Sequence, residues 1–323
     1  MIKNIVSAFL KRYYDYKVEI AKGRFKNISL DDAKTQLDFN SLDILPEIDD
    51  CTIYLDPNDE GLSADLYAWG LREPINTYVL CNFIRKERNN LDAIIDVGSN
   101  IGYFPLVELA SGAKYVIAIE PVPETYMFLK KNLNRFKNCI TLNVALSDKT
   151  QKIKMYVLTK LNLATADEKA ALDNVRYHKV PIKEVVEVEG FTLKDIITSQ
   201  KMINHNVLVR MDVEGFEEKI LKNLPEEIYS VSLELHNSAL GYERSVALLR
   251  RLERAGHKVE VIVRELRKAV PLVKYLGINK VLKLYEKTNN PRIFLNPSKE
   301  LIRAVSYTHL RAHETSLHLV CRL

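Results

Sequence analysis

Residues 91–121 read LDAIIDVGSNIGYFPLVELASGAKYVIAIEP, in which two short apolar runs flank a glycine-containing turn and a segment with helical apolar spacing. The first run, Ala93–Ile95, leads into Asp96, and the second, Tyr115–Ile119, leads into Glu120. Continuous apolar strands that alternate with helices are typical of a parallel sheet covered on both faces. Such sheets bind ligands at the carboxyl ends of their strands, so we expect the functional site at the edge that carries these two acids.

The turn between the two strands has the features of a nucleoside site. Gly98 and Gly102 leave no side chain where the backbone must turn sharply and approach a ligand. Glu120 follows Gly98 by 22 residues, about where an acid on the second strand accepts hydrogen bonds from ribose hydroxyls. The turn reads GSNIG and not GxGxxG, so it serves a pyrophosphate poorly. Asp96 repels phosphate but suits a sulfonium or ammonium ligand, which indicates S-adenosylmethionine.

Four motifs of the chain resemble the motif series of the FkbM family. They are Asp96–Gly102 (DVGSNIG), Glu120–Pro121, Asn143–Asp148 (NVALSD) and Arg210–Gly215 (RMDVEG). The resemblance runs from about residue 92 to about residue 236, and the last motif with Glu234-Leu-His236 makes it specific. The family implies a class I S-adenosylmethionine-dependent methyltransferase that acts mostly on hydroxyl oxygens. The implied fold is α/β and Rossmann-like, with a doubly wound, mostly parallel seven-stranded sheet and here an N-terminal helical and strand appendage.

The motifs also give the residues expected to bind the cofactor. On the predicted third strand, residues 140–146, Asn143 and Ala145 share a face. We expect the adenine beside Ser147 and Asp148, at the carboxyl end of that strand. The full cofactor-binding set is Asp96, Gly98, Ser99, Asn100, Gly102, Glu120, Pro121, Asn143, Ala145, Ser147, Asp148 and Asp212.

Transfer of a methyl group to an alcohol needs a base or a metal, because an alcohol is a poor nucleophile at neutral pH. Asp212 lies at the tip of the predicted fourth strand, and Glu234 and His236 share one face of the predicted fifth. A carboxylate in a central strand is costly unless it is paired. We therefore predict Asp212, Glu234 and His236 as catalytic, with Glu214 as a further candidate base. His236 has the most suitable ordinary pKa, about 6.5.

Three alternatives stay open for these groups. His236 may equally be a structural histidine bonded to a backbone carbonyl, and Asp212 may equally contact the methionine amino group. Asp212, Glu234 and His236 also offer the mixed ligands of a divalent cation. Because no paired-ligand spacing supports a metal, we assign no metal ligands.

Composition narrows the function classes. The chain has 323 residues, 47% hydrophobic and 28% charged, as expected of a soluble globular protein. Its net charge of +5 is spread along the chain and gives no case for nucleic acid. Four cysteines without metal or disulfide spacing predict a reducing, cytoplasmic setting. We expect a small-molecule, glycan or lipid-linked acceptor; an RNA methyltransferase and a non-catalytic binding module are the alternatives.

The organisation of the chain is predicted as an N-terminal appendage (1–90), a methyltransferase domain (91–305) and a non-native tail (306–323). The appendage is a possible lid or substrate-side region. Residues 1–17 read as a basic amphipathic helix that packs on its own domain, with contact to an anionic membrane as the weaker alternative. No apolar run reaches the length of a membrane span. Residues 162–179 read as an insertion loop near the substrate.

Two further segments carry predictions about the site and the tail. The cluster of Tyr67, Trp69, Arg72 and Glu73 reads equally as a lid or as a hydrophobic patch with a solvated ion pair, so none of the four is assigned to the site. Residues 305–315, VSYTHLRAHET, resemble a translated sequencing adaptor. We therefore set aside His309, His313 and His318, take 292–295 as the antiparallel seventh strand, and expect the tail to contribute nothing to the fold.

Overall fold

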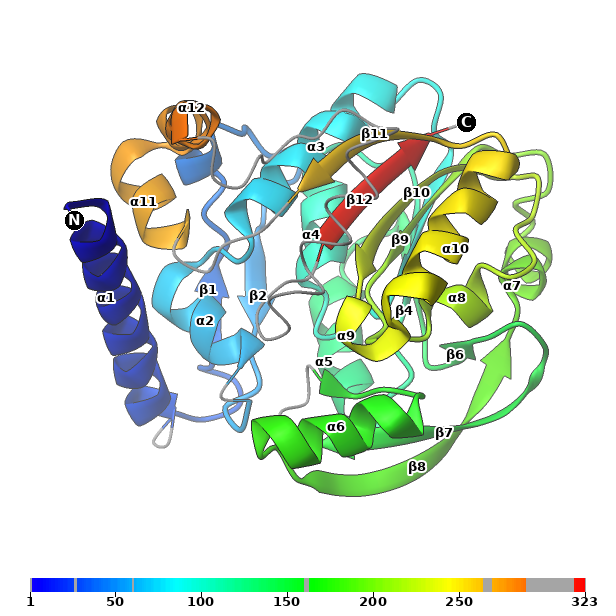
Figure 1. Ribbon diagram of the computed structural model, residues 1–323, viewed down its shortest axis with the longest axis horizontal. Helices are drawn as coiled ribbons and strands as arrows, with labels where there is room; N and C mark the ends of the chain where they lie inside the picture. The colour runs from blue at the N-terminus through cyan, green and yellow to red at the C-terminus, as the bar shows by residue number, and fades with distance from the viewer. Residues whose placement is uncertain are drawn as a thin grey trace.

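The computed structural model describes residues 2–25, 28–59, 61–159, 163–263, 269–288 and 317–322. Its central sheet has the strand order β11-β12-β10-β9-β3-β4-β5 (Figure 1). Five neighbouring strands run parallel: β10 (Ile228–Leu235), β9 (Val207–Met211), β3 (Ala93–Val97), β4 (Val116–Ile119) and β5 (Cys139–Leu142). The predicted mostly parallel α/β sheet is therefore confirmed.

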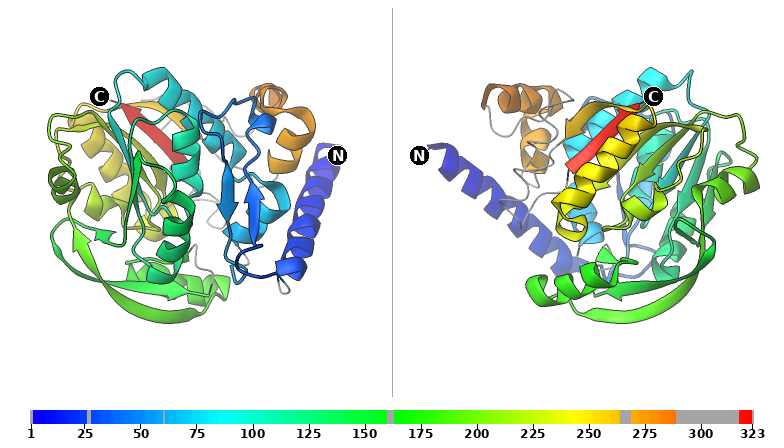
Figure 2. Two further views of the ribbon diagram at one scale, coloured as in Figure 1. Left: turned by 180° about the vertical axis from the view of Figure 1, so that it is seen from behind. Right: turned by 45° about the vertical axis from the view of Figure 1, so that its right-hand side comes forward.

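Helices cover both faces of this sheet (Figures 1 and 2). Ile94 of β3 packs with the helices α3 (Pro74–Glu87), α4 (Tyr103–Ala110) and α5 (Pro123–Leu133). Its neighbours Ile95 and Val97 pack on the other face, with α7 (Leu193–Ser199), α8 (Glu217–Ile220) and α10 (Tyr242–Arg254). This alternation along one buried strand is what a doubly wound sheet requires. Because β3, β4, β9 and β10 run parallel, their carboxyl ends lie along one edge of the sheet.

The N-terminal appendage is joined in the structure by two helices from late in the chain. Its first part comprises α1 (Ile2–Phe25), β1 (Lys34–Gln36), the 3₁₀ helix η1 (Asn40–Leu42), β2 (Thr52–Tyr54) and α2 (Leu62–Trp69). Its second part comprises α11 (Ala269–Leu276) and α12 (Ile278–Thr288), which contact α1, α3 and η1. Lys274 pairs with Asp38 at 2.5 Å and fixes α11 to the segment before η1. The domain boundary at residue 90 stays a prediction, although contacts cross it.

Helix α1 packs on its own chain, as expected. The Tyr14 ring stacks on Trp69, with centroids 5.8 Å apart and planes at 7°, and the Val18 side chain is also buried. Figure 2 shows α1 lying along the side of the appendage. None of the helices in the described part of the chain is long and apolar enough to cross a membrane.

The insertion after β5 is more ordered than the sequence predicts. A three-stranded sheet of order β6-β8-β7 joins β6 (Ala145–Leu146), β8 (Ile182–Phe191) and β7 (Gln151–Leu158). Within 162–179, the predicted loop is replaced by helix α6 (Glu168–His178), because Asp167 caps it by accepting from the Ala170 backbone N–H at 2.9 Å.

The predicted third strand, 140–146, is divided in the structure. Strand β5 ends at Leu142, and Ala145 pairs instead with Gly190 of β8. The Asn143 side-chain amide explains the break, since it donates to the backbone carbonyls of Glu120 and Pro121 at 2.9 and 3.0 Å. These bonds hold the chain in a turn just beyond the sheet, and β6 leaves in a different layer.

The antiparallel position in the sheet is filled by the tail. Strand β12 (Leu317–Arg322) pairs antiparallel with β10 and with β11 (Lys258–Val263). The predicted strand at 292–295 lies outside the described residues. The predicted count of seven strands is reached only with β12, so that count is not confirmed. A foreign origin of residues 306–323 stays a prediction, but the structure gives six of them a place in the sheet.

This placement reverses the expectation for truncation. A chain ending at Val305 leaves facing edges of β10 and β11 unpaired, so we expect it to melt lower than the full chain. A loss of about 1–2 kcal/mol corresponds to a few degrees in a domain of this size. Differential scanning calorimetry checks this, with a chain ending at Ser316 as the control that removes β12 alone. An unchanged melting temperature in both would show that the tail is dispensable.

Candidate functional site

The turn after β3 packs directly against the end of β9. Gly98 has φ +79°, and a Cβ atom there would lie 2.0 Å from the backbone carbonyl oxygen of Asp212. The Asp212 N–H donates to the Val97 carbonyl at 3.0 Å, which holds the two strand ends together. Gly102 has φ +96°, and a Cβ atom there would lie 3.1 Å from the Leu129 side chain of α5, a tight contact but not a backbone clash. Both glycines were predicted for approach to a ligand, but the structure also requires them for packing between strands and helices.

Asp96 is fully buried, and its carboxylate contacts the side chains of Ser99 and Arg210. Ser99 Oγ donates to Asp96 Oδ1 at 2.7 Å, and Arg210 Nη1 lies 3.4 Å from Oδ2. Burial, together with the charge of Asp96, raises the pKa of the neighbouring Glu108 well above its usual range. Both carboxyl oxygens of Glu108 are buried without a hydrogen-bond partner among the described residues, which also favours the neutral acid. Asp96 therefore shapes the turn, and its expected contact with a cationic ligand stays a prediction.

Arg210 is the cation at the centre of the strand ends. It lies on β9 beside Asp96 in the register of the sheet, and its guanidinium contacts Asp96 and Asp212, each at 3.4 Å. Its Cζ lies 3.8 Å from the centroid of the Phe104 ring, which covers one face. Arg210 was predicted only as part of the RMDVEG motif and without a role of its own, although an arginine inside the apolar strand VLVRM indicates a buried partner.

Glu120 stands at the carboxyl end of β4, where it was predicted. Its Oε2 accepts from the Asn100 backbone N–H and its Oε1 from that of Val122, both at 2.9 Å. Each carboxylate oxygen retains capacity for a further donor. Burial raises the pKa of Glu120 to about 7, against the opposing effect of the two N–H groups. The acid is thus held in place beside the turn after β3, with lone pairs left for a ligand.

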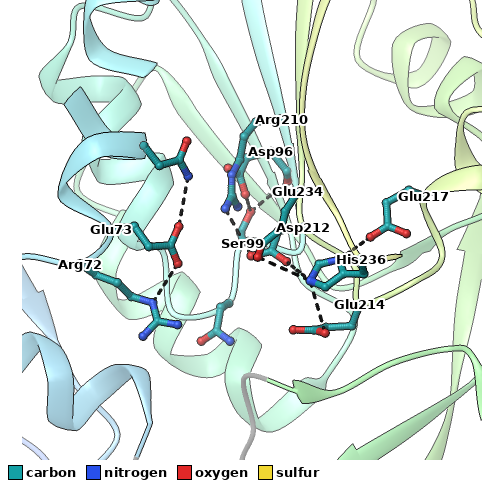
Figure 3. A network of polar contacts seen from close by, with 12 residues as sticks. Arg72, Glu73, Asp96, Ser99, Arg210, Asp212, Glu214, Glu217, Glu234 and His236 are labelled. Atoms are coloured by element: carbon teal, nitrogen blue, oxygen red, sulfur yellow. Dashed lines mark hydrogen bonds and ion pairs between the residues drawn. The ribbon is translucent and has the colours of Figure 1, made fainter. Parts of the chain in front are cut away.

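His236 brings together the predicted catalytic residues (Figure 3). Its Nδ1 lies 2.6 Å from Oε1 of the fully buried Glu217. Its Nε2 faces three carboxylates: Glu214 at 3.4 Å, and Asp212 and Glu234 at 3.7 Å each. Short helix α9 (Asn237–Leu240) follows His236 directly.

The acids change the protonation expected of His236. Burial alone lowers the pKa of His236, but the charges of Glu214 and Glu217 and the bond to Glu217 raise it well above its usual value. The surrounding carboxylates therefore favour the protonated form of His236, and its role as the base stays a prediction. Its predicted alternative, a bond to a backbone carbonyl, is also absent among the described residues, because the Nδ1 partner is a carboxylate.

Two residues of the predicted lid cluster lie near these acids. Arg72 pairs with Asp65 at 2.8 Å and with Glu73 at 3.3 Å. Burial lowers the pKa of Arg72, yet the charges of Glu73, Asp65 and the more distant Glu234 raise it above its usual value. Figure 3 shows Arg72 and Glu73 on the opposite side of Asp212 from His236. Trp69, in contrast, is buried against α1, so the cluster divides into a hydrophobic patch and a polar border of the site.

Ser147 and Asp148, predicted to lie beside the adenine, have their hydrogen-bond and ion-pair partners outside the group around His236. The Ser147 N–H donates to the Phe191 carbonyl in the three-stranded sheet. Asp148 pairs with Lys222 at 2.9 Å, which lowers the pKa of Asp148. The break after Leu142 removes the basis for placing the adenine beside them, since they no longer follow a strand of the central sheet. Their contact with a cofactor stays a prediction, as do the roles of the other predicted residues.

The chain matches one family of known proteins over most of the region that carries the site. The family described as methyltransferase FkbM domain matches residues 96–267, more than half of the chain. No curated protein matches. Matching structures include a precorrin-6y C5,15-methyltransferase from Geobacter metallireducens (12% identity, 76% of this chain and 87% of that chain, TM-score 0.33). Another is a SAM-dependent methyltransferase from Agrobacterium tumefaciens (10% identity, 77% and 62%, TM-score 0.35). These identities and scores are too low to assign an activity.

The contact between Gly98 and Asp212 predicts the effect of a single methyl group. Gly98→Ala should destabilise the protein well beyond the left-handed penalty of about 1–2 kcal/mol, because its Cβ meets a backbone oxygen at 2.0 Å. Gly277→Ala is the matched control, since φ there is +78° with nothing within 4 Å of the new Cβ. Urea unfolding of both variants measures the difference. Equal losses would mean that the strand ends separate easily and that the close approach is not a constraint.

Proposed function

This chain belongs to the FkbM methyltransferase family. From that premise we propose that it transfers a methyl group from S-adenosylmethionine to a hydroxyl oxygen. We propose a sugar, glycolipid or other small metabolite as the acceptor. The observation that carries the proposal is Glu120, a buried carboxylate fixed beside the turn after β3 by the backbone N–H groups of Asn100 and Val122. In sheets of this kind an acid at that place accepts from ribose hydroxyls.

Part of the predicted cofactor-binding set has the chemistry that S-adenosylmethionine requires. Glu120 offers the ribose its remaining lone pairs, and the backbone from Gly98 to Gly102 offers a turn without large side chains. Asp96 supports this turn through Ser99 and is fully buried. When bound, S-adenosylmethionine supplies an electrophilic methyl group on a positively charged sulfur. The carboxylates of Asp212 and Glu234 favour a cation at this edge of the sheet.

The acceptor end of the proposed site is the group of acids around His236. A hydroxyl must lose its proton as the new bond to carbon forms. Asp212 and Glu234 each place a carboxylate oxygen 3.7 Å from His236 Nε2, and the three residues lie at the ends of the adjacent strands β9 and β10. Arg72 and Glu73 border the same acids and would contact an acceptor rich in hydroxyl groups.

The reaction itself is tested by transfer of a labelled methyl group. We expect the purified chain to label a component of glycan or lipid extracts, and we expect His236→Asn to lower that turnover by roughly 10²–10⁴. The affinity for S-adenosylmethionine should change little in this variant. Glu218→Gln is the control, because Glu218 pairs with Arg244 away from His236. Label that appears only in RNA would contradict the proposed acceptor class.

Glu120 predicts how cofactor affinity depends on pH. Ribose hydroxyls donate to the ionised carboxylate, so binding favours loss of the Glu120 proton, and affinity should rise with pH through the free-state pKa of about 7. Titration calorimetry should give a dissociation constant about tenfold larger at pH 6 than at pH 8.

The matched variant is Glu120→Gln, which keeps the shape but does not ionise. It should bind more weakly at pH 8 and lose the Glu120 contribution to the pH dependence. A wild-type affinity that falls as pH rises from 6 to 8, or a variant as tight as the wild type at pH 8, would show that Glu120 does not contact the ribose.

A further inference from the structure

The side chains around His236 have the spacing of ligands around a shared cation. Nε2 lies 3.4 Å from Glu214 Oε2 and 3.7 Å from Asp212 Oδ1, and one ligand atom of each of the three residues lies within 4.8 Å of the others. Two atoms that each coordinate an ion at about 2.1 Å are separated by about 3–4 Å. Small side-chain rotations therefore bring all three atoms within coordination distance of one ion.

The imidazole is aimed at this point by a separate, buried contact. The His236 side chain is only 9% exposed, and Nδ1 is fixed by Glu217 Oε1 at 2.6 Å. Glu217 is fully buried and is held in turn by the Gly215 backbone N–H at 3.2 Å. A metal-binding histidine typically donates its other ring nitrogen to a carboxylate in this way.

The second ring nitrogen, in contrast, has no hydrogen bond among the described residues. Its distances of 3.4–3.7 Å to three carboxylates exceed those of an ordinary N–H···O bond. This nitrogen is thus buried, aimed at acids and left at a distance from all of them. That arrangement distinguishes the group from a simple cluster of surface acids.

The backbone holds Glu214 at a cost. Glu214 has φ +50°, a left-handed conformation that is strained for a residue with a side chain. Thr165 Oγ1 donates to the Glu214 carbonyl at 2.9 Å and fixes this turn from the insertion. Arg210 contacts Asp212 through Oδ2, which leaves Oδ1 on the side of His236.

We propose that Asp212, Glu214 and His236 bind a divalent metal ion, with Glu217 as a positioning residue for the imidazole. Two carboxylates and one imidazole suit a hard or intermediate ion such as Mn²⁺ or Mg²⁺ better than a thiolate-preferring one. Metal binding itself does not depend on the proposed reaction. Its role there, to hold the acceptor hydroxyl and favour loss of its proton, rests on the proposed function.

The test is a titration of the full chain with Mn²⁺ after removal of metals by chelation, followed by electron paramagnetic resonance. We expect one tight site for each chain, and displacement of Mn²⁺ by excess Mg²⁺. Glu214→Gln and His236→Asn should weaken binding by at least about 100-fold, and Glu217→Gln by about 10–100-fold. Glu218→Gln should bind as the wild type does.

Two controls keep the result interpretable. Melting temperatures without metal identify any variant that fails to fold, and for the wild type the same scan with Mn²⁺ should show an upward shift. The variant H309Q/H313Q/H318Q removes the tail histidines and should retain the tight site. No binding by the wild type, or binding unchanged in both Glu214→Gln and His236→Asn, would overturn the proposal.

The titration also separates this proposal from the proposed function. Mn²⁺ binding needs neither S-adenosylmethionine nor an acceptor, and the Glu120 titration needs no metal. A chain that binds the cofactor but no Mn²⁺ refutes the metal site alone. A chain that binds Mn²⁺ at His236 but no S-adenosylmethionine supports the metal site and refutes the proposed reaction.

Discussion

The buried guanidinium of Arg210 holds the functional edge of this protein together. It lies between Asp96, at the end of β3, and Asp212, just after β9, and contacts each at 3.4 Å. Without this cation, the buried carboxylate of Asp96 would lose its charge partner. Removal of one partner of a buried ion pair typically lowers the free energy of unfolding by about 3–5 kcal/mol. The apolar face of Phe104 covers the guanidinium and limits its access to water. The strand ends can therefore carry several acids while the sheet stays folded.

This ion pair connects the two halves of the site. On one side, Asp96 orients Ser99 and so the turn that leads to Asn100 and Glu120. On the other, Arg210 holds Oδ2 of Asp212 and leaves Oδ1 facing His236. The contact between the Asp212 carbonyl and Gly98 joins the same two turns through the backbone. The two turns are thus joined both by a side-chain ion pair and by a backbone contact.

Much of this edge could be predicted from the sequence, because strand and turn patterns are local. The β3–β4 unit and Glu120 follow from apolar runs and spacing, and the shared face of Glu234 and His236 follows from the two-residue period of β10. The direction in which Asp96 points was not predictable, since it depends on Arg210, 114 residues away. No local pattern distinguishes Glu217 from Glu218 either. Glu217 is fully buried and contacts His236, whereas the Glu218 side chain is 32% exposed and pairs with Arg244. The break of the third strand depends likewise on one side chain, Asn143, reaching back to the preceding turn.

The return of α11 and α12 to the N-terminal appendage has a consequence for synthesis of the chain. Asp38 and Asp43 lie near the start of the sequence, but their partners Lys274 and Asn279 are made only after every strand of the central sheet except β12. Helix α1 and the segment around η1 therefore leave the ribosome long before the helices that cover them. During that interval, the apolar residues that α11 and α12 later cover are exposed to solvent and to other proteins. Such transient exposure is expected when contacting segments are distant in sequence. The first part of the appendage is therefore made first but is covered only late in synthesis.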